Sequence, residues 1–114
     1  MGVPTVADLL PEFTAELKAL LARVGRVELA EQLDRLPIVD RCHCGDDSCS
    51  HFYTATKPVA AYGAGHANVL LPAESGLIVV DTIAGAIVAI EVLDRPDVKR
   101  VLDEYLPPTT RPIG

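Results

Sequence analysis

The sequence of 114 residues contains no tryptophan and only two phenylalanines and three tyrosines, so any folded core must be mainly aliphatic. Its ten lysines and arginines are scattered without a run, and the net charge at pH 7 is −6. Nucleic acids and anionic membranes attract positive surfaces, so this charge disfavours both as partners. The apolar share of 49% is nevertheless typical of a folded chain, and the length favours a single domain over residues 1–114.

Signals for export, for the membrane and for common catalysis are also missing. The N-terminus lacks the basic start of a signal peptide. The longest apolar stretch, 76–93, contains Asp81 and Glu91, so it is expected to form two strands and not a membrane span. Neither a Ser-His-Asp order nor a glycine-rich phosphate or dinucleotide motif is present. We therefore expect a cytoplasmic protein.

The first part of the chain, 1–36, is predicted to be helical. Its apolar residues recur at intervals of three and four, which is typical of one buried helix face. Pro11 suits the first turn of this helix and Gly25 its C-terminal cap. A second helix is expected from about 27 to 35, which makes a helical hairpin. The stripe of the first helix comprises Phe13, Leu17, Leu20, Leu21 and Val24.

The middle part, 37–93, is predicted to form a small, mostly antiparallel sheet of four or five strands. Two β-branched apolar runs, 76–83 and 86–93, are joined at Ala84-Gly85 and indicate a tight hairpin. Because these runs are almost continuously apolar, we expect both faces of the sheet to be covered. Shorter strands are expected at 38–44, 49–56 and 68–71, a C-terminal helix at 96–106 and a tail at 107–114. The expected fold class is α+β.

All three cysteines and two of the three histidines lie within the ten residues 42–51. Alternate residues of a strand share a face, and a four-residue turn would place Cys44 about 5 Å from Cys49. Thiolates and imidazoles are the donors that zinc prefers, so Cys42, Cys44 and Cys49 are predicted to bind Zn²⁺. A Cys44–Cys49 disulfide is also geometrically possible, but it would leave Cys42 without a partner.

The residues alone leave the fourth zinc ligand open. His51 has the same strand parity as Cys49 and lies close to it in sequence. His43 lies between two cysteines and would point the other way. His66 follows a Gly-Ala-Gly segment that could fold it back over the cluster. The hypothesis therefore includes His51 and His66 as alternatives.

From Pro37 onward, about two-thirds of the chain resembles an uncharacterised family of small bacterial proteins. The resemblance is carried by three motifs: C-x-C-x4-C-x2-F-Y-T at 42–54, G-x-G-H-x-N-V at 63–69, and the apolar hairpin ending in I-V-x-x-E-V-L at 87–93. The family pattern includes the histidine that matches His66 but not the position of His51. The resemblance therefore favours His66 as the fourth ligand, and it implies no known activity.

The predicted function is that of a small zinc-binding protein of unknown biological role, with a structural ion, which serves as a binding or regulatory module. Four protein ligands would leave zinc no open position, so catalysis is not expected. The alternative is an enzyme, either zinc-dependent through three thiolates and a water, or redox-active at Cys44 or Cys49. A third interpretation is an interaction protein whose apolar hairpin pairs with another chain or with itself.

Other acidic residues have less specific interpretations. Asp46 and Asp47 could form an acid/base or Mg²⁺ pair, but acidic residues in a turn are usually solvated. Glu91 could bond to a ligand histidine, as acidic groups around metal sites do. We expect instead that Glu91, and Asp81 opposite it, point to solvent. Tyr53 and Tyr62 could line a pocket beside the cysteines, although core packing is the simpler expectation.

Overall fold

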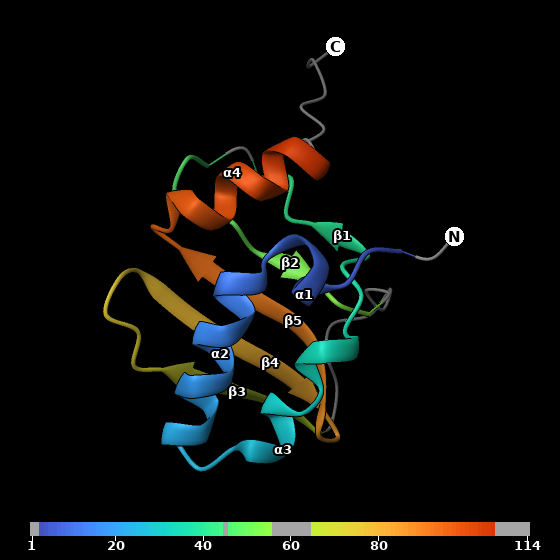
Figure 1. The fold of residues 1–114 in the computed structure, drawn as a ribbon, viewed down its shortest axis with the longest axis vertical. Coiled ribbons are helices and arrows are strands. Elements are labelled where there is room, and N and C mark those ends of the chain that lie inside the picture. The colour runs from blue at the N-terminus through green and yellow to red at the C-terminus, as the bar shows by residue number, and fades with distance from the viewer. Residues whose placement is uncertain (1–2, 45, 56–64, 107–114) are drawn as a thin grey trace.

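The computed structural model describes residues 3–44, 46–55 and 65–106, and these form an α+β fold (Figure 1). Five antiparallel strands make one sheet in the order β1-β2-β5-β4-β3, which confirms the expected fold class. The helices are α1 Val6–Leu9, α2 Pro11–Arg23, α3 Val27–Ala30, the 3₁₀ helix η1 Leu33–Arg35 and α4 Pro96–Tyr105. The strands are β1 Asp40–Arg41, β2 Phe52–Tyr53, β3 His66–Leu71, β4 Leu77–Ile83 and β5 Ala86–Leu93.

The first helix of the predicted helical hairpin agrees with the sequence analysis, whereas the second does not. Pro11 opens α2, and the residues buried on that helix include four of the five in the predicted stripe. The expected continuous helix over 27–35 is wrong, because α3 ends at Ala30 and a separate 3₁₀ turn follows. Between them, the Gln32 amide donates to the Gly85 carbonyl at 2.8 Å and accepts from the Ile87 N–H at 2.9 Å. This clamp ties the helical part to the β4–β5 turn.

The β4–β5 hairpin is confirmed, and its turn has the geometry that right-twisted strands prefer. Ala84 and Gly85 both have positive φ, 51° and 85°, as in a type I′ turn. Before this turn, between Asp81 and Thr82, the pairing of β4 with β5 is irregular and its register shifts by one residue. The shift turns Ile87 toward the core while Ala89 stays opposite Asp81.

One face of the sheet and the helices enclose the hydrophobic core. In Figure 1 the helices α1, α2 and α3 lie in front of the sheet, and α4 lies beyond the end of β5. Core residues come from all of these helices, including Leu29 and Ala30 of α3, and from one face of the strands. The expectation that both faces are covered is met in part: the described helices pack on one face only, but on the other face Asp81 is 3% exposed and Ala89 4%. On the other face of β3, Leu70 is 62% exposed.

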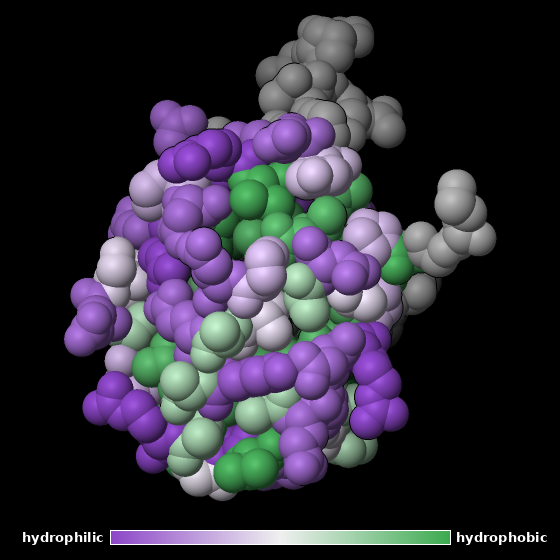
Figure 2. Space-filling view, viewed as in Figure 1, coloured by the Kyte–Doolittle hydropathy of each residue, from purple (hydrophilic) through white to green (hydrophobic). Residues whose placement is uncertain are grey.

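The surface seen from the helical side is mainly polar, with one apolar area between α4 and α1 (Figure 2). A hollow of about 280 Å³ lies where the start of α2 meets α4, and Leu10, Phe13 and Val101 contribute to its lining. None of the helices that the structure describes is both long and apolar enough to cross a membrane. Residues 57–64, which include Tyr62, and the predicted tail at 107–114 lie outside the described residues.

Candidate metal centre

The three cysteines converge as predicted. Their Sγ atoms all lie within 4.8 Å of one another, and all three are free thiols. Cys49 is buried, Cys42 is half-buried and Cys44 is exposed. Zinc binds thiolates at about 2.3 Å, which places sulfurs roughly 4 Å apart in a tetrahedral site. The three sulfurs therefore need only a small contraction to share one ion.

The loop that carries the thiols is fixed at both ends by backbone hydrogen bonds. The Cys42 N–H donates to the His51 carbonyl at 2.8 Å, which extends the short β1–β2 pairing by one step. On the other side, Cys49 forms a bridge with Leu93 at the end of β5, and the Asp94 N–H donates to the Ser48 carbonyl at 2.8 Å. The cysteine loop is thus attached to both β1 and β5.

Backbone N–H groups point at two of the sulfurs. The Asp46 N–H donates to the sulfur of Cys44, and the His51 N–H donates to the sulfur of Cys49, so each bond reaches back two residues. The bond from Asp46, together with those from the other two thiols, lowers the pKa of Cys44. Burial raises the pKa of Cys49 to about 12, which outweighs its bond from His51. In the metal-free protein, Cys44 therefore ionises before Cys49.

Arg41 hydrogen-bonds to the backbone of Cys42 and so supports the site, a role that the sequence did not indicate. Its guanidinium is 2% exposed, donates to the Cys42 carbonyl at 3.2 Å and pairs with Asp103 of α4 at 2.6 Å. A third bond reaches the Leu106 carbonyl at 3.3 Å. A single arginine between Asp40 and Cys42 carries no motif, because its two partners on the C-terminal side, Asp103 and Leu106, lie more than sixty residues away in the chain.

His51 lies beside the thiols but is not part of the 4.8 Å group. It follows Cys49 by two residues, and both belong to the sheet face that is turned away from the core. Its Nε2 atom is buried and has no hydrogen-bond partner, which is costly for an imidazole unless a ligand supplies one. Burial also lowers the pKa of His51, so the ring is neutral near pH 7 and able to coordinate a metal.

The structure does not bring His66 to the cysteines, although the family resemblance favoured it. His66 pairs with Ile83, which pairs with Ala86 at the start of β5, whereas Cys49 pairs with Leu93 at its end. Strands rise about 3.3 Å per residue, so roughly 20 Å separates the two positions along the sheet. The Nε2 atom of His66 instead lies 3.7 Å from Asp81 Oδ1.

The remaining polar candidates near the loop have structural roles. His43 Nε2 lies 2.9 Å from Asp40 Oδ1, and His43 is not part of the 4.8 Å group of thiols. The Asp46 carboxylate accepts from the backbone N–H and the hydroxyl of Ser48, which is the bonding of a turn residue. Asp47 is exposed. These contacts favour the turn interpretation over an acid/base pair.

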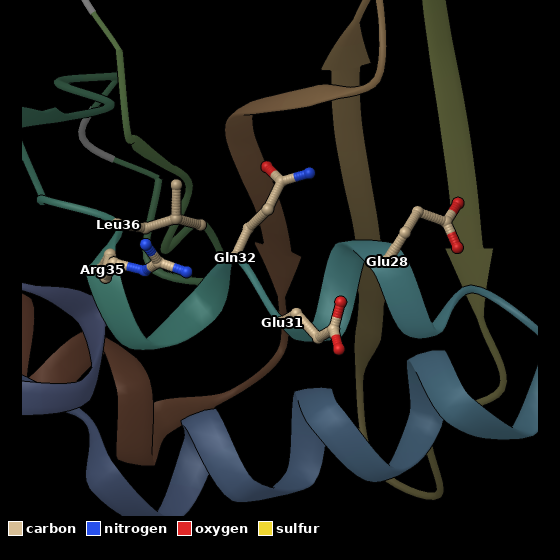
Figure 3. A pocket seen from close by; sticks show the side chains of 5 residues that line it. All are labelled: Glu28, Glu31, Gln32, Arg35 and Leu36. Atoms are coloured by element: carbon tan, nitrogen blue, oxygen red, sulfur yellow. The ribbon is translucent and has the colours of Figure 1, made fainter.

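A second recess in the surface offers no chemistry comparable with that of the three cysteines. It has a volume of about 420 Å³ and lies over α3 and η1 (Figure 3). Gln32 contributes to its wall but is already bonded to the β4–β5 turn. The other lining side chains, Glu28, Glu31, Arg35 and Leu36, spread around an open rim in Figure 3 and do not converge on one point.

The acidic residues of the β4–β5 hairpin are not both solvated, so the expectation for Asp81 is wrong. Asp81 is 3% exposed, and Asn68 donates to its Oδ1 at 2.5 Å. Burial, and then the neighbouring Glu91, raise the pKa of Asp81 to about 7. Glu91 is half-buried. Asp81 therefore keeps its proton until the pH approaches neutrality.

Asp81→Asn is expected to flatten the dependence of stability on pH. The pKa of Asp81 is higher in the folded than in the unfolded protein, so its ionisation lowers the free energy of unfolding as pH rises from about 4 to about 7. One proton limits this slope to about 1.4 kcal/mol per pH unit. Urea unfolding with chelator present, from pH 4 to 8, measures the effect. The exposed control Glu104→Gln should retain the wild-type slope, and parallel curves for Asp81→Asn would contradict the assignment.

No family model, curated protein or solved structure matches this chain.

Proposed function

We propose that the protein is a small cytoplasmic zinc-binding protein in which Cys42, Cys44, Cys49 and His51 hold one structural ion. The observation that carries the proposal is the convergence of three free thiols within 4.8 Å. Three thiolates and one imidazole are a common donor set for structural zinc. The family resemblance and the bacterial origin that it implies stay predictions.

Hydrogen bonding around the sulfurs supports a metal site over a chance cluster. A thiolate that binds zinc keeps excess negative charge, and backbone N–H groups that donate to sulfur stabilise that charge. Such donors reach both Cys44 and Cys49. The Arg41 guanidinium, paired with Asp103, donates to the Cys42 carbonyl and so fixes the backbone of this ligand.

His51 is proposed as the fourth ligand in place of His66. It shares the sheet face of Cys49, and its buried Nε2 has no partner in the structure. A rotation of its side chain toward the sulfurs would give that nitrogen a partner and close the coordination. A closed site has no position for water, so the ion stabilises the loop and presents it as a binding or regulatory surface.

Metal titration of the purified protein tests the proposal. Reduced protein stripped with EDTA is expected to bind one zinc per chain, measured by chelator competition and by elemental analysis. Cobalt substituted for zinc should give thiolate-to-cobalt charge-transfer absorption that saturates at one equivalent. Mass spectrometry after iodoacetamide should show three modified cysteines without metal and strong protection with zinc. Failure to bind stoichiometric zinc would refute the proposal.

Thiol redox chemistry is the second candidate, and one observation favours it. Cys44 is exposed, its pKa is lowered, and two further thiols lie within 4.8 Å. This function predicts that Cys44 in the protein as purified reacts quickly with iodoacetamide and that mild oxidation forms a disulfide that dithiothreitol reverses. Zinc-dependent protection of all three thiols in the purified protein would instead support the metal site.

A further inference from the structure

Polar side chains form a diagonal row across the sheet face that the described helices leave uncovered. The row starts at His51 beside the thiols, continues through Glu91 on β5 and Asp81 on β4, and ends at Asn68 on β3. Strand parity places all four on the side opposite the core residues. The row therefore extends from the cysteine loop into the centre of the sheet.

His51 and Glu91 are direct neighbours across two paired strands. Cys49 pairs with Leu93 on one side of them and Phe52 with Ile90 on the other, so His51 stands opposite Glu91. Residues in such positions have Cβ atoms about 5 Å apart, within reach of an imidazole and a carboxylate. The negative charge of Glu91 also acts on the ring, because it raises the pKa of His51 against the effect of burial.

The Glu91 carboxylate is held in place from its other side. Asp81 hydrogen-bonds to it, and Asn68 in turn donates to Asp81. Among the residues that the structure describes, neither acid forms an ion pair with a lysine or an arginine, and the basic side chains that are paired have other acidic partners. No lysine or arginine of the described residues therefore neutralises Glu91, and His51 is the neighbouring ring on which its charge acts.

We propose that Glu91 is a positioning residue for the metal centre: its carboxylate accepts the N–H of one His51 ring nitrogen and so turns the other nitrogen toward the three thiols. Asp81 and Asn68 keep Glu91 in this orientation. A metal-binding histidine needs an acceptor for its second nitrogen, and loss of that acceptor typically lowers metal affinity 10- to 100-fold. This inference depends on the proposed function, because it assigns the support of the same site.

Glu91→Gln tests the inference, since it removes the charge and keeps the shape. The zinc affinity of the whole protein, measured by chelator competition, is expected to fall about 10- to 100-fold. His51→Ala should also lower it, and the double variant should lose little more than His51→Ala alone, because Glu91 acts only through that ring. The exposed Glu74→Gln is the matched control and should bind zinc as the wild type does.

The cobalt spectrum separates the possible results. In Glu91→Gln the ligand-field bands should shift toward those of His51→Ala, an effect that a merely destabilised fold would not produce. Unchanged affinity in Glu91→Gln, or additive losses in the double variant, would overturn the positioning role while leaving the zinc site intact. If His51→Ala changes neither affinity nor spectrum, the fourth ligand is wrong and the positioning role with it. Wild-type protein that binds no metal would refute the proposed function itself.

Discussion

Cys44→Ser is expected to remove the stabilisation that zinc gives the protein while leaving the metal-free fold unchanged. Cys44 is exposed, so a serine there disturbs no packing, and exposed substitutions usually change stability by less than about 0.5 kcal/mol. A ligand that binds only the folded state at 1,000 times its Kd adds about 4 kcal/mol, and loss of one of three thiolates should abolish most of this gain. Thermal unfolding with and without zinc measures it.

The metal-free proteins are the internal control for this result. In EDTA, wild type and Cys44→Ser should unfold at nearly the same temperature, and only the wild type should shift upward when zinc is added. An equal upward shift in both would show that Cys44 does not ligate the ion. Cys49→Ser is less informative, because Cys49 is buried and its replacement would also alter packing.

Gly76→Ala is expected to destabilise the fold by about 2–5 kcal/mol. Gly76 has φ of 73°, which costs an alanine about 1–2 kcal/mol. A Cβ atom there would also lie 2.4 Å from the Leu93 carbonyl oxygen and 2.8 Å from Arg95 Cγ, and relief of such overpacking costs a further 1–3 kcal/mol or so. Leu93 is the bridge partner of Cys49, so zinc affinity should fall as well. Urea unfolding and chelator competition measure the two effects.

Gly85→Ala separates the steric clash from the backbone strain. Gly85 has a similar φ of 85°, but nothing lies within 4 Å of the position that its Cβ would take. Its substitution should cost only the conformational part, about 1–2 kcal/mol, and should leave zinc affinity unchanged. Equal losses in the two variants would show that the contact with the Leu93 carbonyl does not matter.

Features set by local sequence were predictable. The apolar stripe of α2 and the β4–β5 hairpin follow from side-chain period and from turn chemistry, which act over a few residues. The convergence of the three thiols was also predictable, because the cysteines are close in sequence and flank a short turn. The split after Ala30 was not, since it accompanies the bonds of Gln32 to a hairpin more than fifty residues away.

The supports of the site depend on pairing between distant strands. His66 was a reasonable candidate only while its strand could be placed freely, and the pairing of β3 with β4 fixes it at the far end of the sheet from Cys49. The pairing of β4 with β5 places Asp81 beside Glu91, although an acidic residue in an apolar run gives no sign of which neighbour it will meet. Arg41 likewise acquires its role only when α4 docks.

The proposed ligands and their supports are separated along the chain. The four ligands come from residues 42–51, whereas Glu91, Leu93 and Asp103 follow about forty or more residues later. A chain emerging from the ribosome thus exposes every donor before the strand that secures them has been made, and closing so short a loop costs little entropy. An ion bound by the proposed ligands would be held loosely at first, and firmly only after β5 and α4 have been made.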